Sequence, residues 1–412
     1  MTASGMRFRR ARFRRTRFRR TRFRRAVSAV LLIFLIPAVL SGCWDSHELD
    51  SMFIVTGVAL DKSENPGQID IAMQIGETKR ESSGSGEASS SQNTTVLLNT
   101  TDDTVLGGSV KLDRNTSHKL LLNHNQALLF GMALAEQGIQ KHIDLFLRVQ
   151  QARLEVPVVI VDGRAEDALS AKLAQDSISG IFLSKVFENM SKNSEEYRVR
   201  LIDLITRLLD ETTAPLVPIV RVSEKGGKQE INVTGMAVFK GDKMIGRLSD
   251  DEVTGYIWSM GKVRQSYMEV GDKYGHVVFD MPSLDCKREV LLQQVGGVRV
   301  ALSVNLTIRI AELQGFDGVE PKELIPRLTV LAQDEVRRKI EDSFKAARKL
   351  NADIYGYGTS VYRKYPKEWR LMKDRWDEVY QDIDFDVRVK AHILGTGQII
   401  QSLEMEENMN EN

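Results

Sequence analysis

The chain has 412 residues, of which 42% are hydrophobic and 27% charged, an ordinary composition for a globular protein. Residues 1–42 hold twelve of the basic residues, all arginines, and none of the acidic ones, so residues 43–412 carry 45 basic against 56 acidic side chains, a net formal charge of −11. This acidic balance argues against a nucleic acid as partner. The 370 residues after position 42 are enough for two or three domains with substantial cores.

Residues 7–26 repeat a five-residue unit, Arg-Phe-Arg-Arg followed by Ala or Thr. Such a pattern can bind anionic lipid head groups or nucleic acid. A signal peptide, however, needs only a few basic residues before its apolar core. Two other interpretations therefore stay open, an expanded repeat or a start codon assigned too far upstream.

An apolar run, residues 26–40, follows the repeat and ends at residues 40–43, Leu-Ser-Gly-Cys. A basic segment, an apolar segment of about 7–15 residues and small residues before a cut describe a secretory signal. Leu-Ser-Gly-Cys resembles the bacterial lipobox, in which the cysteine receives a diacylglyceryl group and becomes the mature N-terminus. Two acyl chains give the stable anchoring that one chain does not. We therefore predict a signal peptide over residues 1–42 and lipid attachment at Cys43. The alternative is an uncleaved transmembrane helix, which Pro37 and the Ser-Gly pair weaken.

Cys286 is the only other cysteine of the chain. If Cys43 carries lipid, Cys286 has no disulfide partner, and we expect a partly buried free thiol rather than a reactive one. No later apolar run approaches about 18 residues, so we expect the mature chain not to span the membrane.

Residues 43–222 alternate between apolar, β-branched runs and helical periodicity, which predicts an N-terminal α/β region of one or two subdomains. The predicted strands are residues 52–60, 68–75, 126–134, 156–161 and 216–222. The predicted helices are residues 103–114, 137–148, 164–175, 178–190 and 195–210. Residues 81–95 are rich in Ser and Gly and predict a mobile loop or the tip of a long hairpin.

Residues 223–230 are polar and contain two glycines, so we predict a linker there, followed by a C-terminal domain over residues 231–403 and a polar tail over residues 404–412. The predicted strands of this domain are residues 231–239, 244–248, 267–281, 298–311 and 383–394. The predicted helices are residues 250–260, with Ser249 as N-cap, and residues 321–350. Residues 351–360 read as a loop containing glycines.

Two apolar helical faces stand out in the C-terminal domain. Residues 321–350 place one along their length, made of Leu324, Leu328, Leu331, Val336, Ile340, Phe344 and Ala347. Trp369, Met372, Trp376 and Val379 share the face of a second helix, and we expect the two tryptophans in the core rather than on a partner-binding surface. The whole pattern predicts a mixed α/β or α+β fold of several domains, with mixed sheets packed against helices and an N-terminal lipid anchor.

The sequence contains no motif that would carry catalysis. The six histidines are scattered without metal-ligand spacing, and His118 and His124 are better explained as surface or core hydrogen-bonders. No nucleophile elbow or P-loop occurs, so we predict no catalytic, cofactor-binding or metal-binding residue. Gly356 and Gly358 are expected to hold backbone conformations that other residues resist. Carboxylate pairs such as residues 102–103 and 250–251 stand at predicted helix starts, where they complement the helix dipole.

A resemblance becomes visible when both ends of the mature chain are compared with a known family. Residues 43–50 (Cys-Trp-Asp-Ser-His-Glu-Leu-Asp) resemble the start of the Ger(x)C lipoproteins, the C subunits of spore nutrient germinant receptors. Residues 54–62 resemble that family's first strand. The C-terminal run also resembles it, at residues 351–358 (Asn-Ala-Asp-Ile-Tyr-Gly-Tyr-Gly), at residues 363–369 (Arg-Lys-Tyr-Pro-Lys-Glu-Trp) and at Trp376. The Arg/Phe repeat and the long Ser/Gly segment depart from the family pattern.

This resemblance implies a mixed α/β protein of several small domains, anchored through Cys43 to the outer face of the spore inner membrane. It also implies integral membrane subunits as partners and no catalytic residue. A second interpretation stays open, an extracytoplasmic solute-binding lipoprotein that captures a nutrient in a cleft. An extracytoplasmic hydrolase is the weakest interpretation, because no nucleophile–base set appears.

Overall fold

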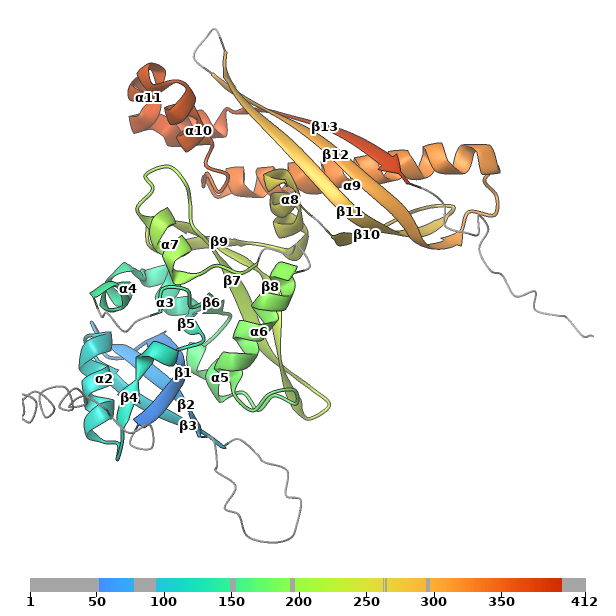
Figure 1. The fold of residues 1–412 in the computed structure, drawn as a ribbon. Coiled ribbons are helices and arrows are strands. Elements are labelled where there is room, and N and C mark those ends of the chain that lie inside the picture. The colour runs from blue at the N-terminus through green and yellow to red at the C-terminus, as the bar shows by residue number, and fades with distance from the viewer. Residues whose placement is uncertain are drawn as a thin grey trace, which may run out of the picture. The chain divides into compact units, whose positions relative to one another are not determined.

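The computed structural model describes residues 52–77, 94–148, 153–192, 197–261, 263, 265–293 and 297–394. The Arg/Phe repeat, Cys43, most of the Ser/Gly segment and the polar tail lie outside these residues. From Phe53 onward the chain forms one compact unit. Two mixed sheets and the helices packed on them make up its frame (Figure 1).

The first sheet has the strand order β3-β2-β1-β5-β6-β7-β8-β9, with β4 paired to β1. Its strands are β1 Met52–Lys62, β2 Ile69–Glu77, β3 Thr94–Asp102, β4 Lys119–Leu121, β5 Leu128–Gly131, β6 Val158–Val161, β7 Leu216–Lys225, β8 Lys228–Lys240 and β9 Lys243–Leu248. The central strands β1, β5, β6 and β7 run parallel, and antiparallel pairs flank them on both sides. Parallel strands are buried on both faces, which explains why β1, β5 and β6 are nearly continuous apolar runs.

Helices cover both faces of this sheet. They are α2 Val105–Arg114, α3 Met132–Gln137, α4 Gln140–Arg148, α5 Ala165–Ser170, α6 Ser179–Lys192 and α7 Leu201–Leu208. Successive residues of a strand point to opposite faces. Ala59 accordingly shares a core with the apolar residues of α5 and α6, whereas Val58 and Leu60 share another with those of α2, α3, α4 and α7.

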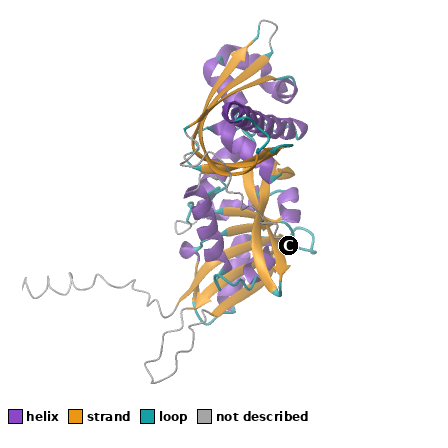
Figure 2. Ribbon diagram, turned by 90° about the vertical axis from the view of Figure 1, so that its right-hand side faces the viewer, coloured by secondary structure: helices purple, strands orange, loops and turns teal. Residues whose placement is uncertain are grey.

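The second sheet has the order β10-β11-β12-β13 and curves around a long helix (Figure 2). Its strands are β10 Ser266–Asp272, β11 Gly275–Leu292, β12 Val298–Gly315 and β13 Asp384–Ile393. The long helix is α9 Pro321–Lys349, and its predicted apolar face is confirmed, with Leu331 only partly buried and the other members buried. The helix α8 Asp250–Met260 packs on α9. Its predicted N-cap is also confirmed, because Ser249 and Glu252 bond reciprocally to each other's backbone N–H.

The predicted strand over residues 267–281 is wrong in one respect, because it is two strands of a hairpin. β10 ends at Asp272 and β11 begins at Gly275, and the two pair in antiparallel register. The carboxylate of Asp272 accepts a hydrogen bond from the backbone N–H of Tyr274 at 2.8 Å, which stabilises the turn. Aspartate bonding to its own backbone two residues on is an ordinary turn signal that the apolar alternation of the flanking residues concealed.

Residues 223–230 were expected to be a linker, but they form the tip of the β7–β8 hairpin. Gly226 and Gly227 have φ values of 60° and 74°, and Lys225 pairs with Lys228 across them. Two left-handed residues in a two-residue loop match a type I′ turn, whose twist suits a hairpin. The first sheet therefore continues through this segment, while the division of the chain into domains here stays a prediction.

Several other boundaries differ from expectation. β3 was missed, although its pairing with β2 from Glu77 and Thr94 onward agrees with a long hairpin around the Ser/Gly segment. The predicted strand over residues 126–134 ends at Gly131, where α3 begins, and Gly138, with φ 126°, separates α3 from α4. The helices predicted over residues 164–175 and 195–210 are shorter, and α10 Tyr357–Lys364 begins inside the predicted loop.

Trp369 and Trp376 do not share one helix. Trp369 lies in α11 Pro366–Met372 and Trp376 begins α12 Trp376–Gln381, with the 3-10 turn η3 Lys373–Arg375 between them. Their expected place in the core is confirmed, because both are 7% exposed. The two rings meet edge to face, with centroids 5.3 Å apart.

Replacing Trp376 by alanine should therefore destabilise the protein by roughly 3–5 kcal/mol, since a buried ring is lost and a cavity is left. The measurement is thermal or denaturant unfolding of the chain from Trp44 onward. Leu371→Ala is the control, because Leu371 is 82% exposed and its truncation should leave the midpoint nearly unchanged. An unchanged midpoint for Trp376→Ala, with loss of partner binding instead, would make this face a docking surface.

Candidate functional site

The segment between α9 and α10 is organised around a buried carboxylate. Asp353 is 4% exposed, and its two oxygens accept hydrogen bonds from the backbone N–H groups of Tyr357 at 3.0 Å and Gly358 at 2.7 Å. These are N–H groups of the first turn of α10, which have no partner inside the helix. Asp353 thus satisfies the start of α10 in place of an N-cap side chain.

Two glycines allow this geometry, each for a different reason. Gly356 has φ 69°, a left-handed conformation, so the expectation of an unusual backbone is confirmed there. Gly358 has no positive φ, and its expected role is corrected. A Cβ on Gly358 would lie 2.8 Å from Cβ of Thr212 and 3.0 Å from the indole of Trp376. Gly358 is therefore needed for close packing.

Burial sets the protonation of Asp353. Removal from water disfavours the charged form and raises the pKa of the carboxyl to about 6, although the N–H groups of Gly358 and Tyr357 act in the opposite direction. The pKa of the Asp353 carboxyl is therefore about 6 in the folded protein, against an ordinary value of 3.8. Its ionised form at neutral pH is maintained at a cost in stability.

A second carboxylate, Asp210, lies opposite Asp353 and follows α7. It accepts hydrogen bonds from the hydroxyls of Thr212 and Thr213, both at 2.9 Å, and from the hydroxyl of Thr359 in α10 at 3.2 Å. The hydroxyls of Thr212 and Thr359 lie 2.6 Å apart. Partial burial raises the pKa of Asp210, but the hydrogen bonds to Thr212 and Thr213 outweigh it and leave the pKa below its usual value. Asp210 is thus a stable acceptor that joins the α7–β7 connection to α10.

Two further contacts tie the same segments together. The backbone N–H of Ala214 donates to the carbonyl of Asp353 at 2.9 Å. At the end of β8, the ammonium of Lys240 lies 2.6 Å from the carboxylate of Asp377 and 3.3 Å from the carbonyl of Asn351. We call this set of contacts, centred on Asp353 and Asp210, the joint.

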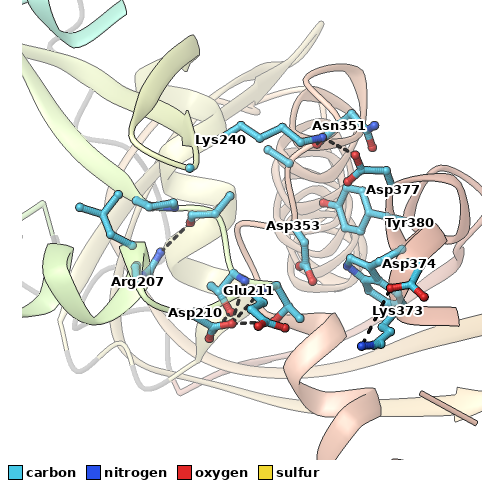
Figure 3. Close-up of a pocket in the computed structure, with 18 residues that line it drawn as sticks. Arg207, Asp210, Glu211, Lys240, Asn351, Asp353, Lys373, Asp374, Asp377 and Tyr380 are labelled. Atoms are coloured by element: carbon cyan, nitrogen blue, oxygen red, sulfur yellow. Dashed lines mark hydrogen bonds and ion pairs between the residues drawn. The ribbon is translucent and has the colours of Figure 1, made fainter. Parts of the chain in front are cut away.

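The joint borders a polar cleft of about 260 Å³. Asp210 and Arg207 enter it from one side, and Asp353, Asp377 and Tyr380 from the other (Figure 3). The Tyr380 hydroxyl is buried and has no hydrogen-bond partner among the described residues. The cleft offers carboxylates, an ammonium group and hydroxyls, which suits hydrogen bonding and ion pairing across the joint.

Two features are absent from the described residues. No group of three or more histidine, cysteine, aspartate or glutamate side chains among them is arranged to hold a metal ion. In the same part of the chain, no helix combines the length and apolarity needed to cross a bilayer.

The residues singled out from the sequence are not brought together. Cys43, the predicted lipid site, lies outside the described residues. Cys286 lies in β11 as a half-buried free thiol, as expected, and burial raises its pKa to about 11, which keeps it protonated. His118 packs against the ring of Phe53 at 4.6 Å between centroids, and His124 is exposed.

Sequence reasoning missed Asp210 and Thr359 and gave Asp353 no role of its own. The run at residues 210–213, Asp-Glu-Thr-Thr, is a recognisable turn in which an aspartate bonds to the backbone two residues on. That signal would have marked a turn. It would not have paired Asp210 with Thr359, which is 149 residues away in the chain.

Two family models match the chain. The spore germination protein N-terminal domain matches residues 45–222, and the model described as spore germination B3/GerAC like, C-terminal, matches residues 234–397. The chain belongs to the GerAC family of spore germination proteins. The resemblance seen in the sequence is thereby confirmed. In this chain, the joint connects the two matched regions, because Asp210 belongs to the first and Asp353, Thr359 and Asp377 belong to the second.

Individual relatives match over almost their whole length. Spore germination protein KC of Bacillus subtilis (strain 168) is 24% identical, over 89% of this chain and 95% of its own. Spore germination protein A3 of the same strain is 23% identical, over 89% and 98%, and spore germination protein B3 is 20% identical, over 89% and 97%. The crystal structure of the GerBC protein is similar in fold, with a TM-score of 0.50 and 17% identity over 82% of this chain and 97% of that one. The predicted mixed, multidomain fold is confirmed.

The protonation of Asp353 makes a prediction about stability and pH. Because the folded pKa lies above the unfolded one, the folded state holds the proton more tightly, and this group's contribution to stability falls as the pH rises from about 4 to about 6. A shift of this size corresponds to roughly 3 kcal/mol. Asp353→Asn cannot ionise and should lose this pH dependence, while being less stable at low pH because its amide group cannot accept one of the two N–H groups.

The measurement is the free energy of unfolding against pH, taken as the difference between wild type and variant. Asp374→Asn is the matched control, because the side chain of Asp374 is 90% exposed and should leave the profile unchanged. Parallel profiles for wild type and Asp353→Asn would contradict the burial of an ionised Asp353.

Proposed function

We propose that this protein is the lipid-anchored C subunit of a spore nutrient germinant receptor. It is held through Cys43 on the outer face of the spore inner membrane and acts, without catalysis, through contacts with the integral membrane subunits of the receptor. The observation that carries the proposal is the position of the lipobox. The match to the N-terminal family domain begins at residue 45, two positions after Cys43, the residue that would carry lipid. A diacylated cysteine there would place the whole family fold at a membrane surface.

The relatives support the same assignment. Proteins named for spore germination match this chain along 95–98% of their own length, so the likeness is not limited to one module. The net formal charge of −11 over residues 43–412 supports a protein partner rather than a nucleic acid.

The runner-up, a solute-binding lipoprotein, would require a pocket that encloses a nutrient. Such sites usually measure about 300–1,000 Å³ and are lined mostly by apolar side chains. The cleft at the joint is smaller, about 260 Å³, and many of its lining residues are charged. The composition of this cleft favours a structural connection over the capture of a solute. Three other pockets have volumes of about 440, 600 and 690 Å³, and each of them is also lined in part by charged side chains.

The anchor is tested with the two cysteines of the chain. Cys43→Ala should abolish incorporation of radiolabelled palmitate and leave the protein soluble or as an unprocessed precursor. Cys286→Ala is the matched control and should keep both the label and the membrane location, because its half-buried thiol is not the lipid site. Equal labelling of Cys43→Ala and wild type would refute the anchor.

The partners are tested by purification of the lipidated protein from spore inner membranes in mild detergent. The proposal predicts that integral membrane subunits of the germinant receptor are recovered with the wild-type protein. Recovery of the lipidated protein alone, with a bound small nutrient, would favour the solute-binding alternative.

A further inference from the structure

A second pocket lies between β11 and α10, outside the joint. Its volume is about 440 Å³, and Arg288, Val290, Tyr357, Ser360 and Lys364 contribute to its wall. This volume falls in the range of about 300–1,000 Å³ typical of small-molecule sites. The pocket combines a guanidinium and an ammonium, both of which can donate hydrogen bonds, whereas the hydroxyl of Ser360 already donates to the carbonyl of Gly356 at 3.0 Å.

Tyr357 contributes to the wall of this pocket, but its hydroxyl lies behind the wall. Tyr357 is 1% exposed, and its hydroxyl has no hydrogen-bond partner among the described residues. The hydroxyl is therefore closed to solvent and does not open into the pocket. Burial raises the pKa of Tyr357, and the positive charge of Arg288 acts on it in the opposite direction, which places the two groups within electrostatic reach.

The two cations retain free donors, although the ammonium of Lys364 also lies 5.3 Å from the centroid of the Tyr365 ring. The ammonium of Lys364 donates to the carbonyl of Val290 at 3.0 Å, which leaves two of its three N–H groups. One terminal nitrogen of Arg288 donates to the sulfur of Met260 at 3.0 Å, and no carboxylate in the described part of the chain forms an ion pair with it. Glu289 is the one acidic residue of the wall, and alternation along β11 turns its side chain to the other face of the strand from Arg288.

The chain segment that contains Lys364 is also basic. Residues 362–375 carry six basic side chains against two acidic ones, and all six are exposed, within a mature chain whose net charge is −11. The six are Arg363, Lys364, Lys367, Arg370, Lys373 and Arg375. A local basic field on an acidic protein concentrates anions at this surface.

We propose that the pocket between β11 and α10 binds a phosphate group, with Arg288 and Lys364 as donors. A guanidinium fork matches the oxygens of a phosphate, and an ammonium adds a point charge. The phosphate belongs either to a phospholipid head group or to a free phosphate or phosphorylated solute. The size of the pocket leaves room for more than the phosphate itself.

The first test is titration of the chain from Trp44 onward with inorganic phosphate, by calorimetry and by the shift in Tm, with sodium chloride at equal ionic strength as baseline. Saturable binding is expected. Arg288→Gln and Lys364→Gln should each weaken it about tenfold, because a charge-assisted hydrogen bond is lost. Arg309→Gln on β12 is the matched control, because its side chain is 58% exposed and it does not line the pocket. Absence of saturable binding, or binding that is equal in all three variants, overturns the proposal.

The source of the phosphate is distinguished with vesicles. Co-sedimentation with vesicles containing phosphatidylglycerol, but not with pure phosphatidylcholine vesicles, assigns the site to a lipid head group if it is lost in Arg288→Gln and Lys364→Gln and persists in Arg309→Gln. Saturable binding of inorganic phosphate without sedimentation in either case assigns it to a soluble phosphate.

Discussion

The burial of the Asp353 carboxylate is the constraint on which the connection between the two matched regions depends. Its two oxygens satisfy the first N–H groups of α10, and this fixes where α10 begins. The position of α10 in turn places Thr359 beside Asp210, on the far side of the cleft. The buried charge lowers the free energy of unfolding at neutral pH. No neutral side chain of this size, however, accepts hydrogen bonds from two N–H groups at once.

The same segments are joined by apolar packing. One core cluster runs from Ala59 in the first sheet through Val238 and Val253 to Val389 in the second. The joint lies at the edge of that cluster, where Trp376 and Tyr380 belong to the cluster and also line the polar cleft. Polar contacts across the joint therefore select one arrangement of segments, and the shared core stabilises it. This explains how a chain that matches two family models forms one compact unit from Phe53 onward.

Sequence patterns predicted the structural features that depend only on neighbouring residues. The apolar run of β1, the apolar face of α9 and the Ser249 cap could be predicted because each depends on neighbouring residues alone. The hairpin turn at Gly226–Gly227 was concealed by the polar composition of its segment. The turn after Asp272 was concealed by the apolar alternation of the flanking strands. The pairing of Asp210 with Thr359 and the burial of Asp353 could not be predicted, because they depend on segments brought together by the complete fold. The basic pocket could not be predicted for the same reason, because Arg288 and Lys364 are far apart in the sequence.

We expect the joint and the shared core to make the two matched regions a single cooperative unit. Differential scanning calorimetry of the chain from Trp44 onward measures this cooperativity. We expect one transition whose van't Hoff enthalpy equals the calorimetric enthalpy, as for a two-state unit. Two separable transitions, one for each matched region, would contradict it.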